Sequence, residues 1–338
     1  MTARHLRAAV TVTVLISLLA VALIALVVQP LVSPIPSQPP EVDVARLAAH
    51  VRRLSVDFYP RSYDRPKNLN LAAQYIYDEL KAAGAEVSFQ DVVVEKATYR
   101  NVIARFGPKA GPLLVIGAHY DSFGDSNIEA GATGSTLKTH TPGADDNASG
   151  VAGLIELARL LGRKPPTRAI ELVAYTLEEP PHYDTGHMGS VWHARSLAAA
   201  KREVQLMLSL EMIGYFTDQP ASQQYPVPGM AHLYSDRGDF ITLVGKLSDF
   251  NSIRKAKALM TGATNLPVYS INSPTLLQGI DFSDHRSYWH EGFPALMVTD
   301  TAFFRNPNYH DAGDTYEKLD YRRMAKVVKA VYALTQGY

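Results

Sequence analysis

The amino-acid sequence predicts one α/β domain with a mixed, mostly parallel β-sheet and helices on both faces, preceded by an N-terminal transmembrane helix. Three observations lead to this prediction. An uninterrupted uncharged segment fills residues 8–28. Strand-like and helix-like patterns then alternate from residue 41 onward. Carboxylate and histidine side chains follow several apolar strands, which is where open parallel sheets place their ligand sites.

The overall composition excludes several classes of protein. The 338 residues include 33 Lys and Arg, 33 Asp and Glu, and no cysteine. This neutral balance lacks the basic excess of nucleic-acid-binding proteins, so no nucleic acid is expected as a partner. Without cysteine there is neither a disulfide nor a thiolate ligand, and any metal must be bound by histidine and carboxylate side chains.

The N-terminal segment has the length of a membrane span. Its 21 uncharged residues, at about 1.5 Å rise per residue, cover the roughly 30 Å hydrocarbon core of a bilayer. Arg4 and Arg7 precede it, so the positive-inside rule places the N-terminus in the cytoplasm and the main domain outside, periplasmic or extracellular. A cleaved signal peptide, followed by secretion, is the main alternative, although its apolar region is usually shorter. A buried core helix is a further alternative.

Five prolines among residues 30–40 predict an extended linker between this segment and the domain. The expected organisation is therefore a membrane anchor or signal segment at 1–29, a Pro-rich linker at 30–40, and one globular domain at 41–338.

The elements of the domain follow from hydrophobic periodicity. Two helices open it, and two strands then pair near the edge of the sheet. Three buried strands alternate with helices in the middle, and a strand and a helix close the chain. The predicted helices are 44–54, 68–83, 148–161, 191–200, 239–247, 252–260 and 319–334, and the predicted strands are 87–94, 101–106, 113–117, 168–177, 204–210 and 295–298.

Three of the buried strands end in side chains that bind metals. His119 and Asp121 follow the first strand, and alternation along a strand places both on one side. A metal-bound imidazole usually donates its other N–H to a carboxylate, so this spacing is typical of a ligand and the group that orients it. Glu178 and Glu179 follow the second strand, and Glu211 follows the third. A solvated charged turn is the alternative for the glutamate pair.

Two loops add further candidates. Asp145 and Asp146 lie just before the helix at 148–161, where capping of the helix N-terminus is the alternative explanation. His310 lies in a polar loop before the last helix, where a plain surface histidine is the alternative. Together these side chains predict a site for zinc or another borderline divalent ion, with room for two ions that share one carboxylate.

These candidate residues, in their order along the chain, resemble the motifs of the co-catalytic zinc aminopeptidases of the aminopeptidase Y and Aeromonas leucyl aminopeptidase type. Relatives of that family include glutamate carboxypeptidase, glutaminyl cyclase and the transferrin receptor ectodomain. The matching blocks are GAHYDS (117–122), PGADDNASG (142–150), the Glu178-Glu179 pair with the following Met188-Gly189-Ser190, SLEMIGY (209–215), SDH (283–285) and YHDAGDT (309–315). They span nearly all of the domain, and the fold that the resemblance implies is a single zinc-exopeptidase domain.

The resemblance assigns a role to each candidate. It implies that His119 and Glu211 bind one zinc ion, that Glu179 and His310 bind a second, and that Asp146 bridges the two. It makes Glu178 the general base that accepts a proton from a zinc-activated water, and Asp121 the partner of His119. Asp145 is a neighbour of the ligands in this pattern.

The chain departs from the family at two places. Many members have aspartate where Glu211 stands, which leaves the preference for zinc over another divalent ion open. Residues 180–187 form an insertion after the glutamate pair, and its Tyr183 either lines the pocket for the first side chain of the substrate or braces the loop. Tyr309 and His285 are further candidates for substrate contact, with pocket support as the alternative for His285.

The leading functional prediction is a two-zinc exopeptidase, most simply an aminopeptidase acting on a peptide or aminoacyl substrate. One alternative is an acyltransferase similar to glutaminyl cyclase that uses one zinc. Another is a catalytically inactive, membrane-anchored binding protein, as the transferrin receptor ectodomain is. The side-chain preference, the physiological substrate and the oligomeric state do not follow from the sequence.

Overall fold

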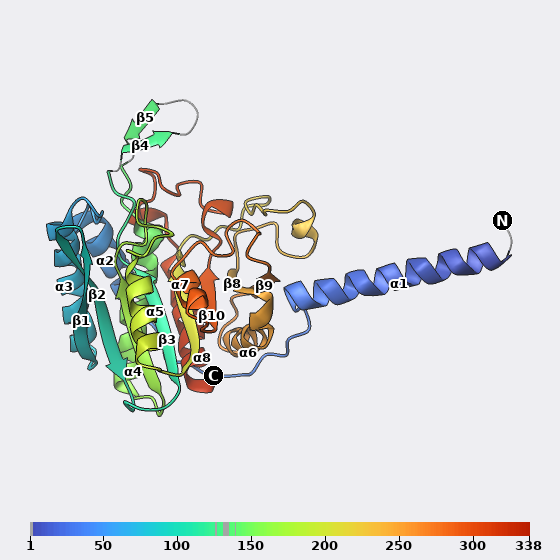
Figure 1. Cartoon of the computed structure of the whole chain (residues 1–338), viewed down its shortest axis with the longest axis horizontal. Coiled ribbons are helices and arrows are strands. Elements are labelled where there is room, and N and C mark those ends of the chain that lie inside the picture. Colours follow the sequence, from blue (N-terminus) through green and yellow to red (C-terminus); the bar gives the residue numbers. More distant parts are fainter. Residues whose placement is uncertain (1–2, 126, 131–134, 139) are drawn as a thin grey trace.

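Eight strands form one mixed sheet in the order β1-β2-β6-β3-β7-β10-β8-β9. The computed structural model describes residues 3–125, 127–130, 135–138 and 140–338, and Figure 1 shows their arrangement. The strands are β1 (Glu86–Val94), β2 (Ala97–Phe106), β3 (Leu113–His119), β6 (Ala169–Tyr175), β7 (Val204–Glu211), β8 (Ile241–Lys246), β9 (Val268–Ser273) and β10 (Ala295–Thr299). A separate hairpin of β4 (Asn127–Ala130) and β5 (Ser135–Lys138) projects from the domain.

The centre of the sheet is parallel, as predicted. Strands β6, β3, β7 and β10 run in one direction, whereas β1 and β2 form an antiparallel pair at one edge. At the other side β8 is antiparallel to β10 and parallel to β9. Because the four central strands are parallel, their carboxyl ends meet along one side of the sheet, and this brings His119 and Glu211 together.

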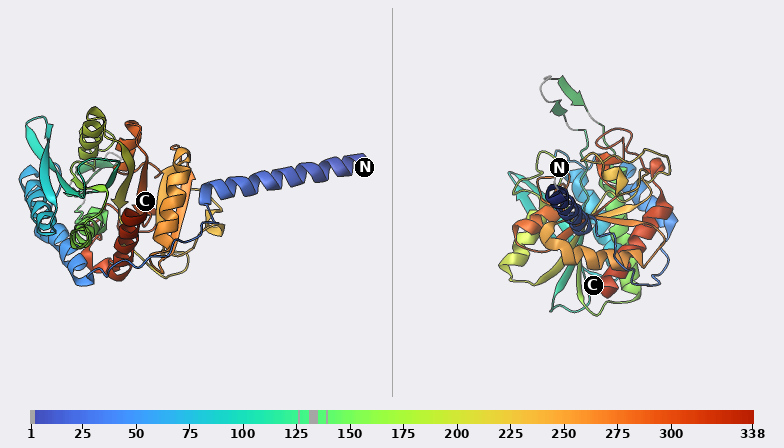
Figure 2. Two further views of the ribbon diagram at one scale, coloured as in Figure 1. Left: turned by 90° about the horizontal axis from the view of Figure 1, so that it is seen from below. Right: turned by 90° about the vertical axis from the view of Figure 1, so that its right-hand side faces the viewer.

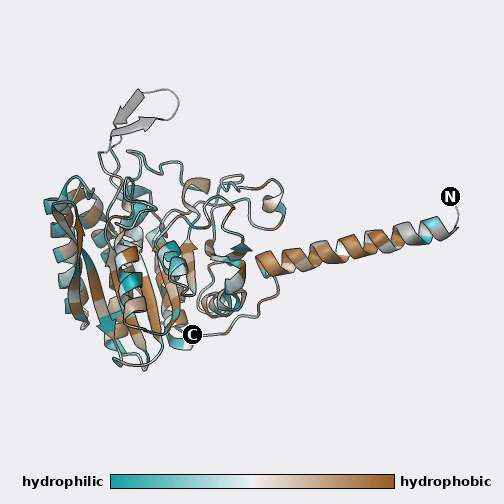
Figure 3. Ribbon diagram, in the orientation of Figure 1, coloured by the Kyte–Doolittle hydropathy of each residue, from teal (hydrophilic) through white to brown (hydrophobic). Residues whose placement is uncertain are grey.

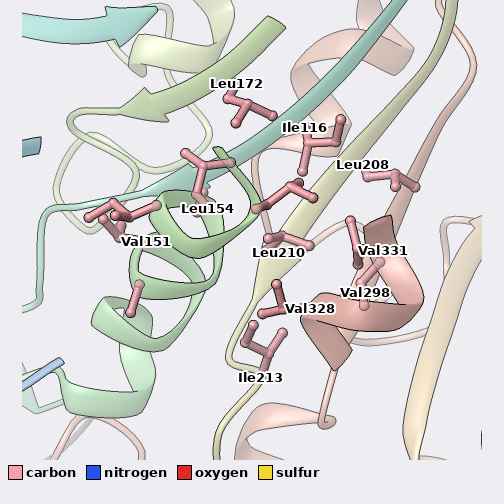
Figure 4. Close-up of a cluster of buried hydrophobic side chains, with 14 of the residues drawn as sticks. Ile116, Val151, Leu154, Leu172, Leu208, Leu210, Ile213, Val298, Val328 and Val331 are labelled. Atoms are coloured by element: carbon pink, nitrogen blue, oxygen red, sulfur yellow. The ribbon is translucent and has the colours of Figure 1, made fainter. Parts of the chain in front are cut away.

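Helices cover both faces, which confirms the predicted layers. One face carries α2 (Val44–Arg52), α3 (Pro66–Ala82), α4 (Gly150–Arg163), α6 (Phe250–Thr261) and α8 (Tyr321–Gly337), and the other carries α5 (Gly189–Ala199) and α7 (His285–His290). Strand side chains alternate between the two cores, as the period of a strand requires. Ile116 and Leu208 pack against α4 and α8 in the larger core (Figure 4), whereas Val115 and Met207 belong to the smaller one.

One predicted element is wrong. The segment expected to be a helix at 239–247 forms β8, and the sequence analysis missed β9 altogether. Phe240, Leu243, Val244 and Leu247 recur at helical spacing, which explains the prediction. Pairing of β8 with β10 on one side and β9 on the other overrides this local pattern, because burial within a sheet outweighs weak propensities.

The N-terminal helix α1 (Ala3–Val28) leaves the domain on the side of β9 (Figure 1) and is apolar over nearly its whole length (Figure 3). Its residues Val10–Val28 are long and apolar enough to cross a membrane, a test that a signal sequence also passes. The following Pro-rich segment is extended but is not a free spacer. Ile35 N–H donates to the carbonyl of Ala258 at 2.9 Å and Ser37 N–H to that of Gly262 at 3.0 Å, so the segment lies along α6.

Candidate metal centre

Three side chains from separate segments converge where β3 and β7 end. His119 is the last residue of β3 and Glu211 the last of β7, and Asp146 comes from the loop before α4. His119 Nε2 lies 3.4 Å from Asp146 Oδ1 and 3.3 Å from Glu211 Oε2. One potential ligand atom from each residue lies within 4.8 Å of the others, and all three residues are buried.

A second group shares Asp146 with the first. His310 Nε2 lies 3.1 Å from Asp146 Oδ2 and 3.2 Å from Glu179 Oε2, and these three residues also present ligand atoms within 4.8 Å of one another. The two groups therefore use different oxygens of the Asp146 carboxylate. The His310 ring is held between those of Phe123 and Tyr309, with ring centroids 4.3 and 3.8 Å away.

Each group is oriented by a buried neighbour. Asp121 Oδ1 lies 3.6 Å from His119 Nδ1, while Asp121 Oδ2 accepts a hydrogen bond from the backbone N–H of Glu179 at 3.0 Å. Ser283 Oγ donates to Glu211 Oε2 at 2.7 Å. Asp121 thus links the histidine of one group to the backbone of a carboxylate ligand in the other.

The site contains more buried carboxylates than imidazoles, and this charge balance favours a bound cation. Five carboxylates, those of Asp121, Asp146, Glu178, Glu179 and Glu211, surround two imidazoles. Burial opposes protonation of His119, but Glu211 and Glu178 outweigh it and raise the pKa of His119 well above its usual value. Burial also raises the pKa of Glu179 to about 7, assisted by the charge of Asp146. Such a group must hold extra protons or bind divalent cations.

The donor set fits zinc. Imidazole nitrogen and carboxylate oxygen are both zinc ligands, and the site offers them in two groups of three. The buried Glu179 Oε1 has no hydrogen-bond partner among the described residues, as expected of an oxygen directed toward an ion. His119, Asp146 and Glu211 would bind one ion, and Asp146, Glu179 and His310 the other.

Glu178 lies beside both groups and belongs to neither. Its Oε2 is 3.9 Å from His119 Nε2. Burial is the main cause that raises the pKa of Glu178 well above its usual value, and the charges of Glu211 and Glu179 add to it, although His119 opposes them. The two adjacent glutamates therefore have different neighbours, since Glu179 faces His310 and Glu178 lies beside His119.

The structure adds two supporting residues that the sequence analysis missed. The Asp314 carboxylate accepts hydrogen bonds from the backbone N–H groups of Asp145 and Asp146, at 2.9 and 3.1 Å. Asp314 lies inside the block at 309–315, so this motif was the available signal. The Asp145 carboxylate accepts hydrogen bonds from Gly214 N–H and from the side-chain amide of Asn306.

Arg61 is the second missed residue, and nothing in the sequence around it marks it out. Its guanidinium is fully buried and donates only to backbone carbonyls. The acceptors are those of Leu54, Tyr120, Pro142 and Gly143. Arg61 thereby joins the segment after α2 to the residue between His119 and Asp121 and to the loop that carries Asp146.

The three candidates for substrate contact lie in different surroundings. Tyr309 lines an apolar cavity that reaches Glu211. Tyr183 instead donates to the carbonyl of Asp281 at 3.1 Å, and its ring lies under the Arg286 guanidinium, so it braces the insertion at 180–187. His285 is fully buried and donates to the carbonyl of Ile280 at 2.8 Å, which places it behind the cavity wall rather than in the cavity.

The cavity beside Glu211 is lined mainly by aromatic and aliphatic side chains. Glu211 itself is the only charged residue among those described in its lining. The remaining lining residues include Tyr225, Met230, Tyr234, Phe240, Val244, Ile271, Leu277, Ile280, Phe282, Met297, Phe303, Phe304 and Tyr309.

A mixed sheet with two histidine–carboxylate groups at the ends of its parallel strands defines the class of metal-dependent exopeptidases and their relatives. The chain belongs to peptidase family M28, whose sequence pattern it matches over residues 101–335. It is 49% identical to the uncharacterized protein YfbL of Escherichia coli (strain K12) over 306 residues, which cover 90% of this chain and 92% of YfbL.

Two further comparisons agree with this assignment. A probable leucine aminopeptidase of Trichophyton verrucosum is 27% identical over 284 residues, which cover 81% of this chain and 67% of that protein. The crystal structure of Fimbriiglobus ruber glutaminyl cyclase superposes with a TM-score of 0.66 at 20% identity, covering 90% of this chain and 98% of that one. Membership of family M28 and the aminopeptidase relatives support the predicted metal-dependent exopeptidase.

Proposed function

We propose that this protein is a membrane-anchored aminopeptidase that uses two zinc ions. The observation that carries the proposal is the Asp146 carboxylate, whose two oxygens face two separate sets of ligands, His119 with Glu211 and His310 with Glu179. A shared carboxylate of this kind is what a pair of ions about 3.5–4 Å apart requires.

The residues around the metal centre have different proposed roles. Zinc, when bound, supplies a Lewis acid and lowers the pKa of a coordinated water from 15.7 toward about 7. Glu178 would accept a proton from the attacking water and return it to the departing amine, a role that its buried position beside His119 supports. Asp121 orients the ring of His119, because its backbone carbonyl lies 3.1 Å from Nδ1 and its carboxylate lies 3.6 Å from the same atom.

The apolar cavity is the proposed pocket for the first side chain of the substrate. Its lining is rich in aromatic residues, contains Tyr309, and reaches Glu211 of the metal centre. A bulky apolar side chain gains free energy there by leaving water, whereas a charged one has no counter-charge except Glu211. The proposed preference is therefore for leucine-like or aromatic N-terminal residues.

A glutaminyl-cyclase-like acyltransferase is the second candidate, because a solved glutaminyl cyclase has the same fold. That alternative needs only one zinc ion. The presence of both ligand groups, with Glu211 and His119 in addition to Glu179 and His310, favours the two-ion hydrolase.

The location of the protein is part of the proposal. Helix α1 is long and apolar enough to cross a membrane, and Arg4 and Arg7 flank its N-terminal end. We propose that it anchors the chain with the M28 domain outside the cytoplasm.

The deciding experiment measures metal content and two activities on the full chain purified in detergent. We expect two zinc ions per chain, hydrolysis of leucine p-nitroanilide, and no cyclisation of an N-terminal glutaminyl peptide. One zinc ion with cyclisation would establish the acyltransferase instead. A chain that binds no metal and hydrolyses nothing would point to a binding protein.

A further inference from the structure

The last turn of α1 is built into the M28 domain. Val28 and Gln29 are only 5% and 1% exposed, although the preceding part of the helix is exposed. The final carbonyls of a helix have no partner within the helix. Here Lys257 Nζ donates to the carbonyls of Val28 and Gln29, both at 3.0 Å, and Ser270 Oγ donates to that of Val28 at 3.0 Å. A buried lysine from α6 thus closes the end of α1.

The side chain of Gln29 adds a second connection. Its Nε2 donates to the carbonyl of Phe250 at 3.1 Å and to Asn272 Oδ1 at 2.7 Å, so it links α1 to both α6 and β9. The next residues continue along α6 through Ile35 and Ser37. The chain therefore leaves α1 without any free spacer, and the helix and the domain form one connected body.

Exposed apolar side chains gather around this junction. Leu31 is 84% exposed and Leu276 is 96% exposed, and Leu247 also faces solvent. The Leu31 carbonyl accepts from Arg254 of α6, and the carbonyl of Lys246, which precedes Leu247, accepts from Asn272 of β9. Leu276 follows the last residue of β9, Ser273, by three residues. The right panel of Figure 2 shows α6 and the neighbouring strands grouped around the base of α1.

The same surface is basic. Residues 29–37, 246–257 and 270–276 contain Lys246, Arg254, Lys255 and Lys257, but Asp249 is their only acidic residue. Asp249 is buried and accepts from Lys246 N–H. Lys257 is buried, but Lys246 lies over the Trp289 ring, Lys255 donates to the carbonyl of Tyr338, and Arg254 is exposed. Exposed leucines beside cations are the combination that binds the headgroup region of anionic bilayers.

We propose that the surface made of Leu31, Lys246, Leu247, Arg254 and Leu276, here called the base face, lies on the bilayer, and that α1 is an uncleaved anchor joined rigidly to it. This inference rests on the membrane anchor of the proposed function and is independent of the peptidase activity. Strands β10, β8 and β9 separate the metal centre at the end of β7 from this face. The metal centre is therefore held away from the lipid, whereas the apolar cavity extends to Leu277, next to Leu276.

The absence of cysteine makes the base face directly testable. Single substitutions Leu31→Cys, Leu247→Cys and Leu276→Cys, labelled with a fluorophore, are placed in nanodiscs of phosphatidylethanolamine and phosphatidylglycerol containing headgroup spin-labelled lipid. We expect strong quenching at all three positions. The matched controls Leu71→Cys and Val93→Cys, exposed on α3 and β1 at the far side of the sheet, should remain unquenched.

The junction is tested by Lys257→Met, which keeps the length of the side chain and removes its three donors. In chains that combine Lys257→Met with the labelled Leu247→Cys or Leu276→Cys, quenching of the fluorophore should fall. Hydrolysis of a soluble substrate should stay unchanged, because Lys257 lies outside the metal centre. Lys109→Met, exposed and remote, should change neither.

Several results would overturn the proposal. Equal quenching at the base face and the far side would show that the domain tumbles freely on a flexible tether. Cross-linking between two chains at position 276 without lipid quenching would identify a dimer contact instead. A mass for the membrane-isolated chain that lacks residues 1–28 would identify a cleaved signal peptide.

Discussion

At the scale of single residues, the adjacent Glu178 and Glu179 lie in different surroundings. Glu179 faces His310 and completes a ligand group, whereas Glu178 stays outside both groups. The sequence analysis singled out His119, Glu178 and Glu211 because they follow apolar strands, and the structure brings these side chains together. It did not predict Asp314, which acts through the backbone of Asp146 and has no strand or helix pattern of its own.

The proposed role of Glu178 as general base predicts the effect of Glu178→Gln. The amide keeps the size of the side chain but accepts no proton, so turnover should fall by about 10²–10⁴-fold, the usual contribution of a general base. Zinc content should stay at the wild-type value. The measurement combines kcat for leucine p-nitroanilide with metal analysis, and the exposed Glu203→Gln is the control. Loss of zinc would mean that Glu178 is a ligand.

A second residue-scale prediction concerns Asp300, which lies beside Asp145 beneath the metal loop. Burial raises the pKa of Asp300 to about 7, although Arg305 opposes it. An unfolded aspartate has a pKa near 3.9, so the folded chain binds the extra proton between about pH 4 and pH 7. The free energy of unfolding should therefore fall as pH rises through this range, by up to about 1.4 kcal/mol per pH unit.

Burial also raises the pKa of the adjoining Asp145 well above its usual value, and Asp300 adds to this, so the extra proton belongs to the pair of carboxyl groups. Asp300→Asn removes one carboxyl group of that pair. Urea unfolding of the zinc-free protein is measured from pH 4.5 to 7.5. In the variant, the free energy of unfolding should fall less steeply with rising pH than in the wild type. Parallel pH profiles for variant and wild type would show that Asp300 does not carry the proton.

At the scale of elements, Arg61 joins three segments that the sequence analysis treated separately. It bonds the carbonyls of Leu54, after α2, of Tyr120, after β3, and of Pro142 and Gly143, in the loop before α4. Such a residue escapes sequence analysis because its partners are backbone atoms from distant segments. The same limit explains the error at β8, where pairing with strands β9 and β10 decided the structure.

Arg61→Met should therefore destabilise the fold and weaken zinc binding together. Each buried group that loses its partner costs about 1–3 kcal/mol, and four carbonyls lose theirs, so a loss of about 3 kcal/mol or more is expected. Urea unfolding and zinc titration measure the two effects. Arg52→Met, an exposed arginine paired with Asp57, is the control and should change neither. Unchanged zinc affinity would mean that the Asp146 loop is positioned without Arg61.

At the scale of the whole molecule, the sequence predicted the layers and the parallel centre, because apolar strands are local signals. The polar residues after those strands are local signals too, and the structure brings them together. It did not predict that the Pro-rich segment lies on the domain. Proline content indicates an extended chain, but it carries no information about where that chain rests. The contacts of Ile35 and Ser37 with α6 are tertiary, and they extend the folded unit back to Gln29.

This extension predicts that residues 29–338 are more stable than residues 41–338, although both contain the whole metal centre. The shorter chain loses the hydrogen bonds of Gln29, Ile35 and Ser37. These residues donate four hydrogen bonds to the domain, so at about 0.5–1.5 kcal/mol each the free energy of unfolding should fall by about 2–6 kcal/mol. Urea unfolding with zinc in excess measures it, and equal zinc content is the control for an intact site.

Gly262→Ala separates this contact from a general effect of truncation. Gly262 has helical backbone angles, so alanine is acceptable there conformationally. An added Cβ would, however, lie only 1.8 Å from the Ile35 carbonyl oxygen. The substitution should therefore destabilise 29–338 and leave 41–338 unchanged or slightly more stable. The same effect in both chains would mean that residues 30–40 do not rest on α6 in solution.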